Sequence, residues 1–242
     1  MKRKDQSLLT PRTVQVVLGR VAKEKSMSDA MNVYHSLTYK FRPNLQTFNI
    51  LLSGWKSSED AHGFFDELRD LGVELDVVSY NCLVDMYCKG REMEKAFKVV
   101  KEMREKDITP DVITYTSLIG GLGLVGQPDK ARGVLKNMRE YGCYPDMTAY
   151  NAAIRNFCIA KRIGDAYGLM DEMIMNGLSP NATTYNVFLR QNDVSVKWWI
   201  KGKSQVMFLL GGSSLGSEQV FIPSELSNIR RFNLLAMTAD IG

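Results

Sequence analysis

A motif that recurs every 35 residues constrains the fold of this chain more than any other feature. Residues 77–111, 112–146 and 147–181 follow one another without a gap, and equivalent residues keep the same place in each unit. These places hold Tyr80, Tyr115 and Tyr150, then Ala96, Ala131 and Ala166, then Met103, Met138 and Met173, and finally Pro110, Pro145 and Pro180. A fixed period of this length is typical of solenoids, in which short units stack on their neighbours.

Each unit contains two helical patterns. In the first unit, apolar residues recur at three- and four-residue spacing over residues 80–87 and again over residues 96–103, which is the spacing of an amphipathic helix. Gly90 separates the two patterns, and residues 109–111 close the unit with Thr-Pro-Asp. Because one short hairpin cannot bury its apolar face alone, neighbouring hairpins must cover it. The pattern therefore predicts an all-α solenoid of antiparallel helix hairpins.

The same register organises the N-terminal part of the chain. Residues 1–10 are a short, basic N-terminal tail, and residues 11–44 are predicted to form a degenerate first hairpin that caps the array. Residues 45–76 form a unit of only 32 residues. Its three missing residues are expected between Trp55 and Glu59, in the turn between the two helices.

The register ends before the chain does. Residues 182–190 begin a further unit with Tyr185-Asn186, and residues 191–242 show neither a second helix nor a repeat period. We expect these last residues to be a non-repeat, disordered tail. The loss of register at Arg190 favours a truncated or alternatively spliced product, or an erroneous gene model, over a genuine extra domain.

Composition narrows the possible functions. A net charge of +4 over 242 residues permits an anionic partner without requiring one. No run of 18 apolar residues occurs, so no membrane span is predicted. The cysteines form no Cys-x-x-Cys pair and lie far from both histidines, so neither a metal site nor another cofactor is expected. Two of the four share the twelfth place of a unit, which predicts reduced thiols packed between helices; the four are Cys82, Cys88, Cys143 and Cys158.

The units resemble pentatricopeptide repeats of the pure 35-residue P class, which is abundant in plants. The resemblance extends over residues 11–190, is most specific over 45–181, and implies a right-handed superhelix. Tetratricopeptide repeats, a related helical array, have a period of about 34 residues and a Trp/Leu-Gly/Tyr signature that this chain lacks. The motif residues are Tyr80-Asn81, Cys88-Lys89, Ala96, Met103 and Pro110-Asp111, with their equivalents in the next two units.

The resemblance implies binding of single-stranded RNA, one base per repeat. In the family, the fifth and the last residue of a unit read the base, and the second residue flanks it. The pairs carried over are Asn49 with Asp76, Asn81 with Asp111, Thr116 with Asp146, and Asn151 with Asn181. They would favour U, U, G and C (with U second), which predicts a core of 5′-UUGC-3′ read along the chain. The flanking residues are Gln46, Val78, Ile113 and Thr148.

The aspartates of these pairs also have a purely structural interpretation. Each stands directly before a predicted helix, where Asp is a preferred N-cap. Capping does not explain the Asn and Thr residues at the fifth place, since both are poor helix formers and lie inside a predicted helix.

The resemblance points to organellar RNA metabolism, meaning RNA stability, processing, splicing or translation. It favours the mitochondrion over the plastid, although residues 1–10 are not a clear presequence. Two alternatives remain open: a scaffold that binds protein on the same concave face, and a truncated product without independent function. No enzyme is expected, because the deaminase or nuclease domains of some family members need His, Cys or clustered Asp residues that residues 191–242 lack.

Overall fold

The computed structural model describes residues 10–37 and 43–189, together with the backbone of residues 196–197 and 209–210. These residues contain 11 helices and one pair of two-residue strands. The helices are α1 (Pro11–Glu24), α2 (Met27–Leu37), α3 (Leu45–Gly54), α4 (Ser58–Asp70), α5 (Val77–Lys89), α6 (Met93–Glu105), α7 (Val112–Leu124), α8 (Pro128–Glu140), α9 (Met147–Ile159), α10 (Ile163–Met175) and α11 (Ala182–Leu189).

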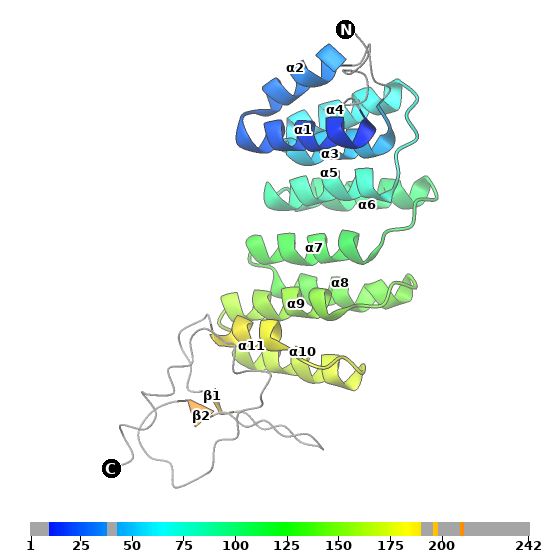
Figure 1. Ribbon diagram of the computed structural model, residues 1–242. Coiled ribbons are helices and arrows are strands. Elements are labelled where there is room, and N and C mark those ends of the chain that lie inside the picture. The colour runs from blue at the N-terminus through cyan, green and yellow to red at the C-terminus, as the bar shows by residue number, and fades with distance from the viewer. Residues whose placement is uncertain (1–9, 38–42, 190–195, 198–208, 211–242) are drawn as a thin grey trace, which may run out of the picture.

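The helices stack as antiparallel hairpins in a single column that starts at the N-terminal hairpin and ends at α11 (Figure 1). The first helix of each hairpin packs on the first helix of the next, so that α1, α3, α5, α7, α9 and α11 form a continuous layer. Each second helix packs on its own partner, and α4, α6 and α8 also reach the first helix of the following hairpin. The predicted all-α solenoid is therefore confirmed.

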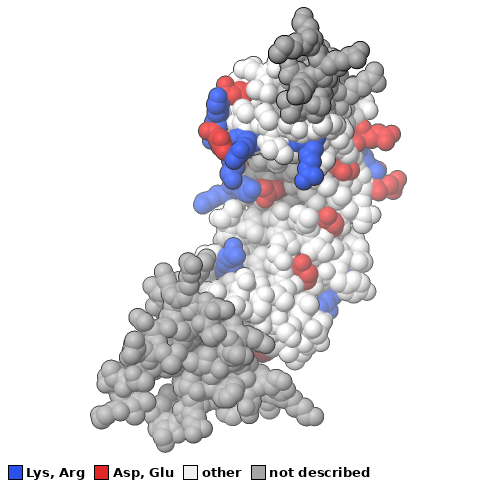
Figure 2. Space-filling model, viewed as in Figure 1, with Lys and Arg blue, Asp and Glu red and all other residues white. Residues whose placement is uncertain are grey.

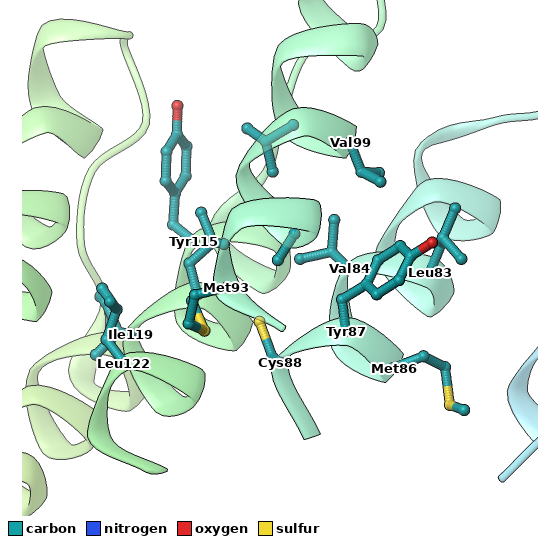
Figure 3. Packing of buried hydrophobic residues seen from close by; sticks show 14 of the residues in the cluster. Leu83, Val84, Met86, Tyr87, Cys88, Met93, Val99, Tyr115, Ile119 and Leu122 are labelled. Carbon is teal, nitrogen blue, oxygen red and sulfur yellow. The ribbon is translucent and has the colours of Figure 1, made fainter. Parts of the chain in front are cut away.

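The repeated residues form the core between the hairpins. Tyr80 is 1% exposed and Tyr150 is fully buried, and the repeated Ala and Met side chains are buried completely as well. An Ala at the twentieth place allows the second helix to approach its neighbours closely. Figure 3 shows how side chains of α5, α6 and α7, among them Cys88, Met93 and Ile119, meet in one continuous cluster. The sequence thus repeats every 35 residues because the same core contacts recur from one hairpin to the next.

Side-chain caps fix where the first helices begin. The Oδ1 atoms of Asp76, Asp111 and Asp146 accept the backbone N–H of the residue three places on, at 3.0, 2.9 and 2.8 Å. This contact satisfies one of the N–H groups that have no partner inside a helix. The second helices α6, α8 and α10 begin without such a side-chain cap. The capping aspartates therefore set the register of the layer of first helices.

The short unit differs from the expectation for residues 45–76. Helix α3 has 10 residues, whereas α5, α7 and α9 have 13 each. The turn that follows, Trp55 to Ser57, is as long as the equivalent turn after α5. The three missing residues therefore come from the last turn of the first helix and not from the interhelical turn. Ser57 is the N-cap of α4, and its Oγ accepts the backbone N–H of Asp60 at 3.3 Å.

Little of the chain beyond residue 189 is described. Strand β1 (Val196–Lys197) pairs antiparallel with strand β2 (Leu209–Leu210), and the sequence did not predict this pair. The remainder of the expected tail, like residues 1–9, lies outside the described residues. None of the helices placed in the structure is both long enough and apolar enough to cross a membrane.

Candidate nucleic-acid interface

The predicted base-reading residues meet between successive first helices. Each fifth residue projects from one first helix, and the last residue of the same unit caps the next first helix. We call each such meeting place a junction. Junction 1 is Asn49 with Asp76, junction 2 is Asn81 with Asp111, junction 3 is Thr116 with Asp146, and junction 4 is Asn151 with Asn181.

Junctions 1 and 2 are closed by hydrogen bonds. Asn49 Nδ2 donates to Asp76 Oδ1 at 3.2 Å, and Asn81 Nδ2 donates to Asp111 Oδ1 at 3.0 Å. The structure therefore brings together residues that lie about 30 places apart in the sequence. The same Oδ1 atoms also cap the following helix, so each aspartate joins two neighbouring first helices.

A buried hydroxyl group, which the sequence analysis did not identify, completes each closed junction. Ser79 Oγ donates to Asn49 Oδ1 at 2.7 Å, and Thr114 Oγ1 donates to Asn81 Oδ1 at 2.5 Å. Both side chains belong to residues that are fully buried. The available signal was a Ser or Thr at the third place of most units. That place holds Thr47, Ser79, Thr114, Ala149 and Thr184.

Junctions 3 and 4 are open. Neither is closed by a hydrogen bond within the described residues, and the buried atoms Thr116 Oγ1 and Asn151 Oδ1 have no partner there. Junction 3 lacks a hydroxyl at the third place because Ala149 stands there. At junction 4, Asn181 Oδ1 instead accepts the N–H groups of Thr183 and Thr184 at the start of α11. Polar atoms that are buried without a partner cost free energy, so these two junctions are ready to accept one.

The open junctions line a cleft of about 710 Å³ that extends from α5 to the start of α11. All four residues of junctions 3 and 4 lie on its wall, and so do the flanking residues Ile113 and Thr148. The other two flanking residues, Gln46 and Val78, are exposed but lie outside this cleft. The cleft also contains Gly120 and Gly121. A side chain at Gly120 would meet nothing within 4 Å, so its absence leaves the cleft open over α7, whereas Gly121 faces Cys88 of α5.

Comparison with known protein families identifies matches over the repeat units. Sequence models described as the PPR repeat family match residues 75–124 and 145–191, and a model described as the pentatricopeptide repeat domain matches residues 105–158. These matches cover the units that carry three of the four junctions completely. Residues 75–191 of this chain belong to the pentatricopeptide repeat family.

Curated relatives come from Arabidopsis thaliana. The pentatricopeptide repeat-containing protein At1g02420 is 58% identical over an alignment that covers 41% of this chain and 28% of that protein. The mitochondrial pentatricopeptide repeat-containing protein At5g15010 is 32% identical over 35% of this chain and 16% of that protein. The chain thus spans less than a third of the length of either relative.

Solved structures share the fold of this pentatricopeptide repeat array. The maize pentatricopeptide repeat protein PPR10, in complex with an 18-nt psaJ RNA element, has a TM-score of 0.67 at 23% identity. The match covers 75% of this chain and 27% of PPR10. The PPR domain of Arabidopsis protein-only RNase P 1, in complex with tRNA, has a TM-score of 0.56 at 16% identity and covers 76% of this chain and all of that domain. At these identities the likeness concerns the fold.

The repeat array carries no continuous basic stripe along its first helices. The cleft contains two cations, Lys89 and Arg155. Lys89 is paired with Asp85, with 2.5 Å between Nζ and Oδ2, whereas Arg155 projects from the same place of α9 as Asp85 does from α5. In the view of Figure 2, Lys and Arg side chains gather over the N-terminal hairpins, and the rest of that face carries scattered charges of both signs.

The carboxyl group of junction 1 is stabilised in its charged form. Burial raises the pKa of Asp76, but hydrogen bonds from the backbone N–H of Ser79 and from the Asn49 amide lower it more. The net effect holds the pKa of Asp76 below its ordinary value. Asp76 is therefore an anionic hydrogen-bond acceptor at neutral pH.

The first hairpin repeats this arrangement with different residues. Gln15 is the fifth residue of α1, and its Nε2 donates to Asn44 Oδ1 at 2.9 Å and to Thr47 Oγ1 at 3.3 Å. Asn44 closes the hairpin and caps α3, just as Asp76 caps α5. The sequence analysis treated residues 11–44 only as a cap because their first helix lacks the Tyr-Asn pair. The structure shows that this hairpin nevertheless presents a fifth residue to a closing residue.

The cysteines lie between and beside the helices of the array. All four thiols are free, and Cys88 and Cys158 are buried between helices as predicted. Burial raises the pKa of Cys88 to about 12 and that of Cys158 to about 11. Over the described ranges, no three His, Cys, Asp or Glu side chains gather in a way that could hold a metal ion.

Proposed function

We propose that this chain binds single-stranded RNA along its layer of first helices and reads one base at each of the four junctions, with the core 5′-UUGC-3′. The observation that carries the proposal is the pairing of a fifth and a last residue across successive helices. Asn49 with Asp76 and Asn81 with Asp111 form this pair by direct hydrogen bonds. The family resemblance and the RNA-bound structure of PPR10 support the same class of ligand.

The chemistry of a closed junction favours a base edge that has a ring N–H beside a carbonyl oxygen. A carboxylate can only accept hydrogen bonds, and the Asn amide nitrogen still has a second N–H to donate. This combination matches an edge with an N–H beside a carbonyl oxygen, as in U and G. It opposes C and A, where a ring nitrogen that accepts lies beside an amino group that donates. Junctions 1 and 2 therefore support U or G, and the aspartate of junction 3 favours the same two bases.

Junction 4 lacks a carboxylate. Asn181 replaces the aspartate, and its amide can both donate and accept. An amide can complement the amino group and ring nitrogen of cytosine, which a carboxylate cannot. The choice of C at this junction, and of U or G at the others, follows the family pattern.

The proposed role is non-catalytic and organellar. The name of At5g15010 places that relative in mitochondria, which supports the mitochondrion over the plastid for this chain. RNA stability, processing, splicing or translation would each follow from occupying a defined RNA segment. A protein scaffold is the alternative, and one observation favours it: Ile113 and Leu124 expose apolar side chains in the cleft.

A titration with fluorescent RNA tests the proposal. The full chain is titrated against UUGC in a neutral spacer and against UUAC, at one fixed salt concentration because phosphate contacts depend on salt. Asp146→Asn should reverse the preference from G to A, since in the family Thr with Asn reads A. Asn is also a good N-cap, so the variant keeps the start of α9. Asp171→Asn makes the same charge change on α10, outside the cleft, and serves as the matched control.

Each result has a clear meaning. A preference that reverses in Asp146→Asn and not in Asp171→Asn supports base reading at junction 3. If the folded wild-type chain binds UUGC and UUAC equally well, the assignment of junction 3 is wrong. If a chain with helical circular dichroism binds neither RNA, the scaffold or the product without independent function replaces the proposal.

A further inference from the structure

The buried hydroxyl groups of Ser79 and Thr114 occupy an unusual position between a helix cap and a junction. Ser79 Oγ accepts the backbone N–H of Asp76 at 3.4 Å, and Thr114 Oγ1 accepts that of Asp111 at 3.1 Å. Each hydroxyl oxygen also lies near two possible acceptors. These are the Oδ1 of the capping aspartate, at 3.0 Å in both cases, and the Oδ1 of the asparagine in the junction.

A hydroxyl group has one hydrogen, so it can donate to only one of these acceptors. The contact with the asparagine oxygen is the shorter in both junctions. The aspartate orients the amino group of the asparagine side chain. Because a carboxylate cannot donate a hydrogen bond, the amide turns its NH₂ toward the aspartate. The amide oxygen then faces the hydroxyl. Each asparagine is thereby fixed from both ends, with one N–H left unused.

We propose that Ser79 and Thr114 are positioning residues that set the base selectivity of Asn49 and Asn81. This inference rests on the proposed RNA-binding function and names part of its physical basis. The aspartate and the hydroxyl hold the asparagine side chain from two sides. Its unused N–H, which lies beside the aspartate, is then available to the carbonyl oxygen of U. Without the hydroxyl, the amide oxygen has no partner and only the aspartate holds the amide, so the amide turns more readily and can offer its oxygen to the amino group of C.

The chain contains its own comparison. At junction 3 the third place is Ala149, which has no hydroxyl, and Thr116 Oγ1 is left buried without a partner among the described residues. Junction 4 keeps the hydroxyl of Thr184 but has Asn181 in place of an aspartate, and Asn151 Oδ1 is buried there without a partner among the described residues as well. The contact is thus present where the hydroxyl and the aspartate are both present. Hydroxyl positioning therefore applies to junctions 1 and 2 and not to junction 3.

Two alanine variants test the inference at separate bases. Binding of the full chain is measured for UUGC, CUGC and UCGC in the same neutral spacer. Thr114→Ala should lower the preference for U over C about fivefold at the second base, which corresponds to about 1 kcal/mol, and leave the first base unchanged. Ser79→Ala should have the converse effect at the first base. A general loss of stability cannot move the selectivity of one base alone.

Matched variants separate positioning from folding. Thr114→Ser restores the hydroxyl and should keep the selectivity of the wild type within about twofold, a change of about 0.4 kcal/mol. Thr47→Ala removes an equally buried hydroxyl at the same place of α3, but that hydroxyl donates to Asn44 Oδ1 and not to Asn49 or Asn81. It should change neither ratio. Thr114→Val, which keeps the shape of the side chain, replaces Thr114→Ala if the latter does not fold.

The outcomes are distinguishable. If wild type prefers U and the folded variant without the hydroxyl, Thr114→Ala or Thr114→Val, retains that preference, hydroxyl positioning is overturned and the proposed function stands. A loss of selectivity at both bases in every variant also overturns it, because the effect is then not local. If wild type binds none of the RNAs, both the inference and the proposed function fall.

Discussion

Gly123 provides a sharp test of how adjacent first helices fit together. A Cβ atom at this position of α7 would lie 1.9 Å from Asn156 Oδ1 and 2.4 Å from Asn156 Cγ. Asn156 is 5% exposed, and its Nδ2 donates to the backbone oxygen of Ile119 at 2.6 Å. Gly123→Ala must therefore displace a buried amide that joins α9 to α7.

The size of the effect follows from three contributions. A buried amide that loses its partner costs about 1–3 kcal/mol, and forcing extra volume into a packed interior costs about 1–3 kcal/mol. Replacing a helical Gly by Ala returns about 0.5–1 kcal/mol. We expect Gly123→Ala to lower the free energy of unfolding by about 3 kcal/mol on these terms.

Gly120 supplies the control in the same helix. A Cβ at Gly120 would meet nothing within 4 Å, so Gly120→Ala should raise the free energy of unfolding by about 0.5–1 kcal/mol. Urea unfolding followed by circular dichroism measures both variants. Adding Gly123→Ala to an Asn156→Ala background should cost about 2 kcal/mol less than in wild type, because the obstructing side chain is gone. Equal effects of the two glycine substitutions, or an additive double mutant, would refute the argument.

Three other predictions concern single groups. Burial raises the pKa of Cys88 to about 12 and that of Cys158 to about 11. Both thiols should therefore resist alkylation at pH 8 in the folded chain, while Cys143 reacts faster. Mass spectrometry measures the three alkylation rates, and equal rates would contradict the burial of Cys88 and Cys158. Because the pKa of Asp76 is lowered on folding, its charge stabilises the fold above the unfolded pKa of about 4 and loses this effect as the pH falls through the folded value. The stability difference between wild type and Asp76→Asn should therefore shrink between pH 6 and pH 3 in urea unfolding, and a difference independent of pH would show that the carboxylate is not stabilised. Ala149→Ser should rebuild the reciprocal cap seen at Asp111 and Thr114 and raise the free energy of unfolding by about 0.5 kcal/mol, measured in the same way; a lower stability would show that the site has no room for the hydroxyl.

The sequence predicted the hairpins because their core repeats at a fixed period. Buried residues such as Tyr80 and Ala96 leave that period in the sequence, and so the hairpins and their order could be derived without knowledge of the contacts. The sequence did not show where in the unit of residues 45–76 the three missing residues would have been. A deletion in the turn and a deletion at the end of the helix leave the same pattern of apolar residues. The length of α3, which is three residues shorter than α5 although the following turns are equally long, distinguishes them.

Contacts between units were harder to predict than the units themselves. At one interface Cys88 of α5 faces Gly121 of α7, and at the next Gly123 of α7 faces Asn156 of α9. The large and the small residue exchange places between the tenth and twelfth positions, so neither position shows a constant residue type. The pairing becomes visible only when the stacking of α5, α7 and α9 is known. Junction hydroxyls were missed for the same reason, since they act across units.

Folding and the proposed recognition use different oxygens of the same carboxylate. At Asp111, the contacts from the N–H of Thr114 and from Asn81 Nδ2 both end on Oδ1. Oδ1 is thus the atom that caps α7 and joins it to α5, and Oδ2 is the oxygen that remains for a base. Capping therefore does not compete with base reading, and the two interpretations of the aspartates are compatible. Under the proposed function, replacing such an aspartate by asparagine would keep the cap and change the group offered to the base, so a repeat array could alter its selectivity while its fold stays intact.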